Sequence, residues 1–163
     1  MTIYSSPVPL AGPDTVAPEP YREIYPMPMF VNIPTADLAA SKDFWLRGLG
    51  FIDLFTIPGR LTHLRRWAFQ DVLLHAGEQA AEAPVTSVSF SCVLYELEEI
   101  ADRCEKLLPG CTTGPVDQPW NSRELTVVTP ENARVILTGA KVLDPDSREA
   151  DNIRAIGIEV PRT

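Results

Sequence analysis

The sequence is poor in the residues on which metal chemistry, nucleic-acid binding and membrane insertion depend. Its 163 residues include two histidines, and 14 lysines and arginines stand against 22 aspartates and glutamates, for a net charge of −8. Phosphate backbones are bound by clustered basic side chains, so this balance argues against a nucleic-acid partner. No apolar run approaches the length of a bilayer span, and the first residues lack a secretory signal pattern. We therefore expect neither a nucleic-acid nor a membrane partner, and the acidity suits a cationic or neutral ligand.

Cysteine is also scarce, and no nucleophile motif is present. Cys92, Cys104 and Cys111 form an odd set without CxxC spacing, and Cys104 lies on an apolar helical stripe. We interpret them as reduced core thiols of a cytoplasmic protein. The sequence has no GxSxG motif, no Cys/His arrangement and no GxxxxGK[ST] phosphate loop. We assign no catalytic residue.

Proline is abundant instead, and it marks an N-terminal arm. Seven of the 16 prolines precede Phe30, and residues 1–23 carry few large apolar side chains. Such a segment cannot bury enough surface to offset its own ordering entropy. We expect an extended arm that is either disordered or laid along a partner subunit.

From residue 24 the chain repeats itself. Residues 24–36 and 83–95 are both free of charge, and each is followed by an acidic residue and a leucine, at a constant offset of 59 residues. These are Asp37-Leu38 and Glu96-Leu97, and each acidic residue opens an amphipathic helix, where a carboxylate favours the free N–H groups. Three short strand-like segments follow each helix, so each unit is expected to be strand, helix, strand, strand, strand.

The expected fold is therefore α+β, with two βαβββ modules that pair their curved sheets around a cleft. The modules cover residues 24–82 and 83–141 of a single domain. Residues 142–163 form a tail in which Ile153, Ile156, Ile158 and Val160 are too apolar to remain free, so we expect it to dock as a strand or helix. A cleft of this kind is a natural small-molecule pocket.

The tandem repeat resembles the vicinal oxygen chelate superfamily, which includes glyoxalases, dioxygenases and bleomycin-resistance proteins. The resemblance covers about residues 27–139 and includes the segment NIPTADLAASKDFW at the first helix. Pro119-Trp120 with Arg123-Glu124-Leu125 is most similar to the bleomycin-resistance group, which has Pro-Trp-x-x-Arg-Glu-Phe. The turn after it departs from the group, since residues 129–132 read TPEN rather than Asp-Pro-x-Gly-Asn.

The resemblance also implies where metal ligands would stand. Metal enzymes of this superfamily carry one ligand on the first and one on the fourth strand of each module, and carried onto this chain these positions are Phe30, Leu73, Ser89 and Ile136. Phe30 and Ser89 differ by 59 residues, and Leu73 and Ile136 by 63, which agrees with the offsets of the repeat. Three of these positions are apolar and offer no lone pair to a cation, and the fourth is a hydroxyl, so we expect no metal and no cofactor.

Other side chains leave alternatives open. His75 shares the strand face of Leu73, and His63 is expected almost opposite it, which permits a two-histidine metal site. The competing interpretation places both as imidazoles at the rim. Trp45 fits the core, whereas Trp67 fits core or cleft equally well. Of Arg65 and Arg66, one is expected to face inward, where it can pair with Glu124 or an anionic ligand, although a solvated strand face is favoured for the pair.

These observations predict a metal-independent small-molecule binding protein of the bleomycin-resistance type, which sequesters a cationic or aromatic antibiotic or natural product. The resemblance implies a homodimer whose two chains complete the binding clefts. The alternative is an enzyme on the same fold, either a glyoxalase- or dioxygenase-like lyase or a metal-free isomerase or cyclase. The expected ligand-binding residues are Phe30, Asn32, Trp67, Leu73, His75, Ser89, Trp120, Glu124 and Ile136.

Overall fold

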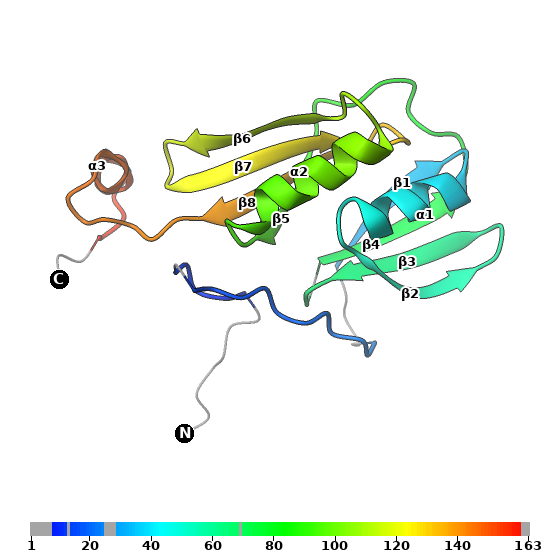
Figure 1. The fold of residues 1–163 in the computed structure, drawn as a ribbon, viewed down its shortest axis with the longest axis horizontal. Coiled ribbons are helices and arrows are strands. Elements are labelled where there is room, and N and C mark those ends of the chain that lie inside the picture. Colours follow the sequence, from blue (N-terminus) through cyan, green and yellow to red (C-terminus); the bar gives the residue numbers. More distant parts are fainter. Residues whose placement is uncertain (1–7, 13, 25–28, 69, 161–163) are drawn as a thin grey trace.

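Two modules of the same order, strand, helix and three strands, follow one another along the chain (Figure 1). The structure, a computed structural model, describes residues 8–12, 14–24, 29–68 and 70–160. The first module comprises β1 (Phe30–Thr35), α1 (Leu38–Arg47), β2 (Ile52–Ile57), β3 (Leu61–Arg66) and β4 (Gln70–Ala76). The second comprises β5 (Val88–Cys92), α2 (Glu96–Leu107), β6 (Thr112–Gln118), β7 (Ser122–Val128) and β8 (Arg134–Ala140). The predicted tandem βαβββ fold is confirmed.

The two four-stranded sheets of the described chain have the same topology. Their strand orders are β1-β4-β3-β2 and β5-β8-β7-β6. In each sheet the first and last strands of the module pair in parallel, and the remaining pairs are antiparallel. The helix supplies the crossover in the connection after the first strand, and tight hairpins join the others.

Helix boundaries follow local chemistry. Asp37 caps α1, and its side chain accepts a hydrogen bond from the Ala40 amide at 3.0 Å. Glu96 is the first residue of α2, after Tyr95, so its carboxylate lies at the positive end of the helix dipole. Gly110 follows the end of α2 with φ 82°, a conformation that glycine adopts without steric cost.

A single apolar core lies between the modules. Trp45 of α1 is fully buried, and its ring meets Phe51 edge-on at 4.9 Å and Phe90 of β5 at 6.4 Å between ring centroids. Phe51 and Phe90 are 5.3 Å apart. One face of each sheet joins this core through Ile33, Leu64, Val72, Leu74, Phe90, Cys92, Leu125, Val127, Val135 and Leu137. Each large side chain buried there contributes about 1.5–3 kcal/mol. Trp45 is thus a packing residue, as predicted.

Two buried polar contacts also join the modules. The Trp45 indole Nε1 donates a hydrogen bond to Glu131 Oε1, 2.6 Å away, in the turn between β7 and β8. Arg66, at the end of β3, donates to the Ser91 carbonyl at 2.6 Å and to Glu96 Oε2 at 2.6 Å. Arg66 is 4% exposed and Arg65 is 0% exposed. The prediction of a solvated strand face for this arginine pair is therefore wrong, because each guanidinium finds acceptors brought from other parts of the chain.

The described part of the N-terminal arm packs on its own chain. The Tyr21 amide donates to the Trp67 carbonyl at 3.1 Å. Arg65 Nη1 donates to the carbonyls of Tyr21 and Glu23 at 2.8 and 2.6 Å. Figure 1 shows this blue segment running along one side of both modules. The sequence left disorder or a partner subunit open, and the structure instead places residues 8–12 and 14–24 against the domain.

The tail contains one helix, α3 (Arg148–Ala155), which begins at a Ser147 cap. Ala150 is fully buried, and Asn152 Nδ2 donates to the Pro119 carbonyl at 3.2 Å. Of the four apolar side chains that favoured docking, Ile153 and Val160 are half-buried, whereas Ile156 and Ile158 are 74% and 55% exposed. None of the helices in the described part of the chain is long and apolar enough to cross a membrane.

The contact between Trp45 and Glu131 yields a test of the core. We expect Trp45→Phe to lower the free energy of unfolding by about 2–4 kcal/mol, because it leaves a cavity and a buried carboxylate without its donor. The double variant Trp45→Phe/Glu131→Gln should recover part of the loss, since a neutral amide is less costly to bury. Urea unfolding measures both. A single variant within about 0.5 kcal/mol of the wild type would contradict this account.

Candidate functional site

The predicted ligand-binding residues of the two sheets lie on the faces that point away from the shared core. Successive side chains of a strand alternate between faces, and Ile33, Val72 and Val135 point into the core. The first sheet therefore carries Phe30, Asn32, Leu73 and His75 on its outer face, and the second carries Ser89, Glu124 and Ile136. Among the described residues, no hydrogen bond, ion pair or ring contact joins the first group to the second.

The cross-strand pairing of the four implied ligand positions differs between the two modules. In the second module Ser89 pairs with Ile136. Phe30, however, lies opposite Asp71, and Leu73 lies opposite Asn32. The repeat offsets align Leu73 with Ile136, whereas the strand pairing aligns Asp71 with Ile136, two residues earlier. A slip of two residues along a strand keeps every side chain on the same face. The residue that sequence reasoning missed is Asp71, a fourth-strand carboxylate on the outer face.

A buried charged cluster surrounds Asp71. Its Oδ1 accepts hydrogen bonds from His63 Nε2 at 2.7 Å and from Arg65 Nε at 2.8 Å, and all three side chains are at most 3% exposed. The His63 ring lies edge-on between Phe30 and Phe55, at centroid distances of 5.0 and 5.3 Å. The alternation of His63 and Arg65 on one strand was a signal for such a cluster, because it puts both on one face.

The two histidines do not form a pair. The cross-strand neighbour of His63 is Leu73, whereas His75 lies opposite Leu61. His63 is also buried, so its assignment as a rim imidazole is wrong. The cross-strand partner of His63 therefore lies two residues earlier in β4 than predicted. This register brings the Asp71 carboxylate within hydrogen-bonding distance of His63.

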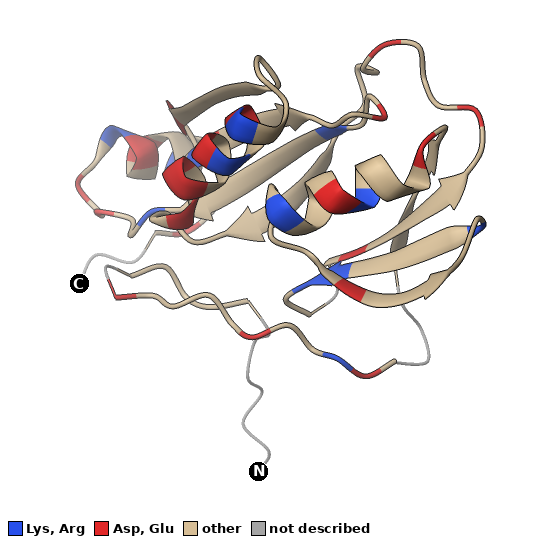
Figure 2. Cartoon of the chain, turned by 45° about the vertical axis from the view of Figure 1, so that its right-hand side comes forward, with Lys and Arg blue, Asp and Glu red and all other residues tan. Residues whose placement is uncertain are grey.

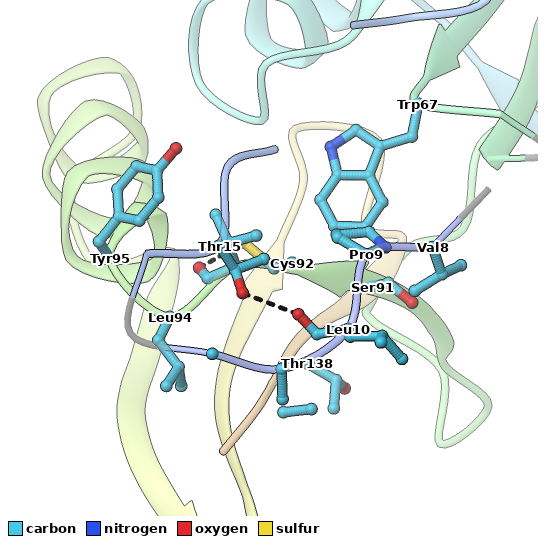
Figure 3. A pocket seen from close by; sticks show the side chains of 14 residues that line it. Val8, Pro9, Leu10, Thr15, Trp67, Ser91, Cys92, Leu94, Tyr95 and Thr138 are labelled. Atoms are coloured by element: carbon cyan, nitrogen blue, oxygen red, sulfur yellow. Dashed lines mark hydrogen bonds between the residues drawn. The ribbon is translucent and has the colours of Figure 1, made fainter. Parts of the chain in front are cut away.

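A pocket of about 240 Å³ lies between the arm and the second sheet (Figure 3). The walls come from the arm, from the segment after β3, from the junction of β5 and α2, and from β8. The lining residues are Val8, Pro9, Leu10, Ala11, Gly12, Thr15, Trp67, Ser91, Cys92, Val93, Leu94, Tyr95, Thr138 and Ala140. Apolar surface thus predominates, and Ser91 and Thr138 are the residues of the second sheet that bring hydroxyls to it.

The sequence left open whether Trp67 lies in the core or in a cleft, and the structure shows features of both. It is 3% exposed and it also lines the pocket. The Arg66 guanidinium lies 4.8 Å from the centre of its ring. Trp67 has φ 56°, which is rare for a bulky residue, and strained positions of this kind cluster at functional sites. Figure 3 shows Trp67 and Tyr95 on opposite sides of the arm segment. A second, more polar hollow of about 340 Å³ shares Trp67 and Tyr95 with this pocket and is bordered by Arg66, Glu96 and Arg103.

Glu124 and Trp120 stand beside this pocket. Glu124 Oε1 accepts hydrogen bonds from Trp120 Nε1 at 3.0 Å, from Ser122 Oγ at 3.3 Å and from Thr138 Oγ1 at 3.5 Å. Thr138 lines the pocket, so one side chain separates Glu124 from it. The suggested pairing of an arginine with Glu124 is wrong, because Arg65 binds Asp71 and Arg66 binds Glu96.

The structure therefore places Trp67 and Thr138 in the lining of one pocket, and hydrogen bonds link Thr138 to Glu124 and Glu124 to Trp120. Ser89 and Ile136 lie one cross-strand row further along the same outer face of the second sheet. Phe30, Asn32, Leu73 and His75 lie on the other sheet and do not line this pocket.

All three cysteines are buried and free. Burial raises the pKa of Cys92 to about 11, of Cys104 to about 12 and of Cys111 to about 11. A thiol with so high a pKa is protonated at neutral pH, and the thiolate is the nucleophile. Cys92 borders the pocket, but it is a packing group there.

Comparison with known proteins shows which known fold this chain has. No protein-family profile matches the sequence, and no curated protein matches it. A variant of the fosfomycin resistance protein FosX from Listeria monocytogenes, complexed with Mn(II) and 1S,2S-dihydroxypropylphosphonic acid, aligns with a TM-score of 0.60. The identity is 14%, over 80% of this chain and 98% of that one. A glyoxalase/bleomycin resistance protein/dioxygenase from Nocardioides aligns at 0.52, with 19% identity over 77% of this chain and 90% of that one.

An integron cassette protein from the mobile metagenome of the Halifax Harbour sewage outfall aligns with a TM-score of 0.56. The identity is 21%, over 69% of this chain and 97% of that one. With the paired βαβββ topology, these matches decide the architecture. The chain has the vicinal oxygen chelate fold. At these identities the likeness establishes the fold alone.

The metal that the vicinal oxygen chelate resemblance implies does not fit the residues of this chain. The four implied positions hold a phenylalanine, a leucine, a serine and an isoleucine, which do not supply the imidazole and carboxylate donors of such a site. Asp71, the carboxylate that the true register adds, is already engaged by His63 and Arg65. Over the described ranges, no three His, Cys, Asp or Glu side chains gather around a possible ion.

The anchoring of the arm by Arg65 can be tested by proteolysis. We expect Arg65→Met to speed tryptic cleavage after the exposed Arg22 at least about tenfold, because two hydrogen bonds from a charged donor are lost. Arg60→Met, which changes an exposed arginine of the β2–β3 turn, is the matched control and should leave the rate unchanged. The double variant Arg65→Met/Asp71→Asn avoids an unpaired buried carboxylate. Equal cleavage of all variants would contradict the anchoring role.

The raised thiol pKa values predict slow chemical modification. In the native protein at pH 8, Ellman's reagent should react with the cysteines far more slowly than in guanidinium, where all three react at once. The native rate should rise about tenfold per pH unit up to about pH 10, since the thiolate fraction grows in that proportion below the pKa. A native rate at pH 8 equal to that of the unfolded chain would show that burial does not protect them.

Proposed function

We propose that this chain is a metal-independent small-molecule binding protein that sequesters an antibiotic or related natural product. Its ligand would place an apolar or aromatic group in the pocket between the arm and the second sheet. The observation that carries the proposal is this pocket, which is walled by Trp67, Tyr95 and the apolar arm residues 8–12. Of the positions where the superfamily's enzymes hold a metal, three are apolar and the fourth is Ser89, and the nearby Asp71 carboxylate is already engaged by His63 and Arg65.

Affinity in such a site comes from buried area. Apolar surface removed from water contributes about 25 cal/mol per Å². A cavity of about 240 Å³ is smaller than the range of about 300–1,000 Å³ that is typical for whole drug-sized ligands. The pocket therefore fits one ring system of a larger molecule, with the remainder lying across the outer face of the second sheet.

The proposal includes a homodimer, which the resemblance to the bleomycin-resistance group implies. The outer faces of both sheets, with Phe30 and Leu73 on one and Ser89 and Ile136 on the other, are the surfaces that a second copy would complete. Two of the similar structures are named as resistance proteins, which supports a protective role.

A pocket-filling substitution tests the site. In buffer with EDTA, we expect aromatic antibiotics, bleomycin among them, to quench tryptophan fluorescence of the wild type. Ala140→Trp should weaken this binding at least about tenfold by occupying the pocket. Ala76→Trp, at the exposed end of β4, is the matched control. Calorimetry and light scattering on the same samples give the ligands per chain and the number of chains. Binding that requires metal, or that ignores Ala140→Trp, would refute the proposal.

One observation favours a metal-free isomerase or cyclase as the second candidate. The Asp71 carboxylate, flanked by Arg65, can only accept, so His63 Nε2 carries the proton. His63 Nδ1 makes no hydrogen bond to a described residue and is then the lone-pair nitrogen of a ring that a carboxylate holds in place. Mass spectrometry of recovered ligand distinguishes the candidates. A rearranged product that His63→Gln abolishes supports the enzyme, and unchanged ligand supports sequestration.

A further inference from the structure

Glu124 is a half-buried carboxylate that makes no ion pair with any described residue. The basic residues nearest to it in the chain are engaged elsewhere. Arg123 Nη2 lies 2.7 Å from Glu98 Oε1, and Lys141 Nζ lies 3.4 Å from Asp117 Oδ2. Arg123 also alternates to the opposite face of β7. The charge of Glu124 is therefore not compensated within the described chain.

The carboxylate is nevertheless held in place. Its Oε1 accepts from the indole of Trp120 and the hydroxyls of Ser122 and Thr138, whereas its Oε2 makes no hydrogen bond to a described residue. Three donors on one oxygen orient the group before any ligand arrives. An oriented anion loses little entropy on binding, so the second oxygen is prepared to receive a donor.

The position of Glu124 is continuous with the pocket. Ser91, Thr138, Glu124 and Val116 are successive cross-strand partners on the outer face of the second sheet. Ser91 and Thr138 line the pocket, and Glu124 is the next residue of this row. Neighbouring strands are about 4.8 Å apart, so a group that extends about 5 Å beyond Thr138 reaches Glu124.

An aromatic surface accompanies the carboxylate. Trp120 is 57% exposed and its Nε1 is directed to Glu124. Indole faces attract cations, and the effect adds to that of a nearby carboxylate. Lys and Arg residues are sparse along the strands of the second sheet (Figure 2). The net charge of −8 raises the local concentration of cations further.

We propose that the natural ligand is an amine-bearing aromatic molecule, with its ring in the arm-lined pocket and its ammonium group bound by Glu124 Oε2 beside Trp120. This inference rests on the proposed binding function and names the ligand class. The ring and the ammonium are separated by a chain of a few bonds, which matches the step from Thr138 to Glu124. Glu124 is a specificity residue that selects charge, and the pocket selects shape.

The experiment uses two fluorescent probes that share a ring and a linker and differ at the terminal amine, which is charged in one and acetylated in the other. Dansylcadaverine carries a naphthalene ring and a five-carbon amine, and its N-acetyl derivative is the neutral counterpart. We expect the wild type to bind the amine at least about tenfold more tightly than the acetylated probe, the factor expected when a hydrogen-bonded ion pair is lost. Glu124→Gln should abolish this preference, and it keeps an acceptor for Trp120.

Asp117→Asn is the matched control. Asp117 is adjacent to Val116 on β6 and points to the other face, where it meets Arg123 and Lys141, so its variant removes the same unit of charge from outside the row. It should keep the preference for the amine. A rise in salt should weaken binding of the amine to the wild type more than to Glu124→Gln.

The outcomes separate this inference from the function on which it rests. If both probes bind the wild type equally, or if Glu124→Gln and Asp117→Asn weaken the amine alike, the inference is overturned. If the inference is overturned in this way but Ala140→Trp still blocks binding of both probes, the proposed binding function is supported. If neither probe binds, the site as proposed is overturned together with the inference.

Discussion

The apolar core that the two modules share determines which surfaces of this chain are open to a ligand. Trp45, Phe51 and Phe90 meet across the module boundary, and each sheet turns one face toward them. Because side chains alternate along a strand, the opposite faces necessarily carry Phe30 and Glu124 outward. Moving these faces inward would expose the core. The placement of the candidate site is thus a consequence of packing, and the contact from Trp45 to Glu131 holds the two modules in that arrangement.

Because side chains alternate along β3, the consecutive residues Arg65 and Arg66 point to opposite faces of the sheet and bind different partners. Arg66 points to the core side and joins β3 to β5 and α2 of the other module, through Ser91 and Glu96. Arg65 points outward, where it binds Asp71 and the backbone of the arm. Burying a guanidinium is costly unless it is paired, so both positions require acceptors from distant parts of the chain. Those acceptors hold together the second module, the arm and the hairpin.

The pocket depends on the contacts of Arg65 with the arm and of Arg66 with the second module. Its walls come from residues 8–15, Trp67, the β5–α2 junction and β8, segments that are far apart in the sequence. Arg65 holds the arm, and Arg66 holds β3 against the second sheet beside Trp67. Glu124 then extends the pocket along a row of cross-strand partners. Binding of a ligand ring and of an attached charge would therefore draw on one sheet and on the arm that covers it.

Local patterns in the sequence determined the elements, and long-range contacts decided their partners. The 59-residue repeat, the Asp37 and Glu96 helix starts and the strand faces follow from periodicities of 3.6 and 2, which a single segment contains. Register does not follow, because a slip of two residues preserves every face. Only the structure shows that Asp71 lies opposite Phe30. Burial of His63, Arg65 and Arg66 was equally hidden, since a charged side chain is buried only where a distant partner compensates it. The arm-lined pocket at Trp67 was decided by tertiary structure alone, because its walls become neighbours only when the chain folds.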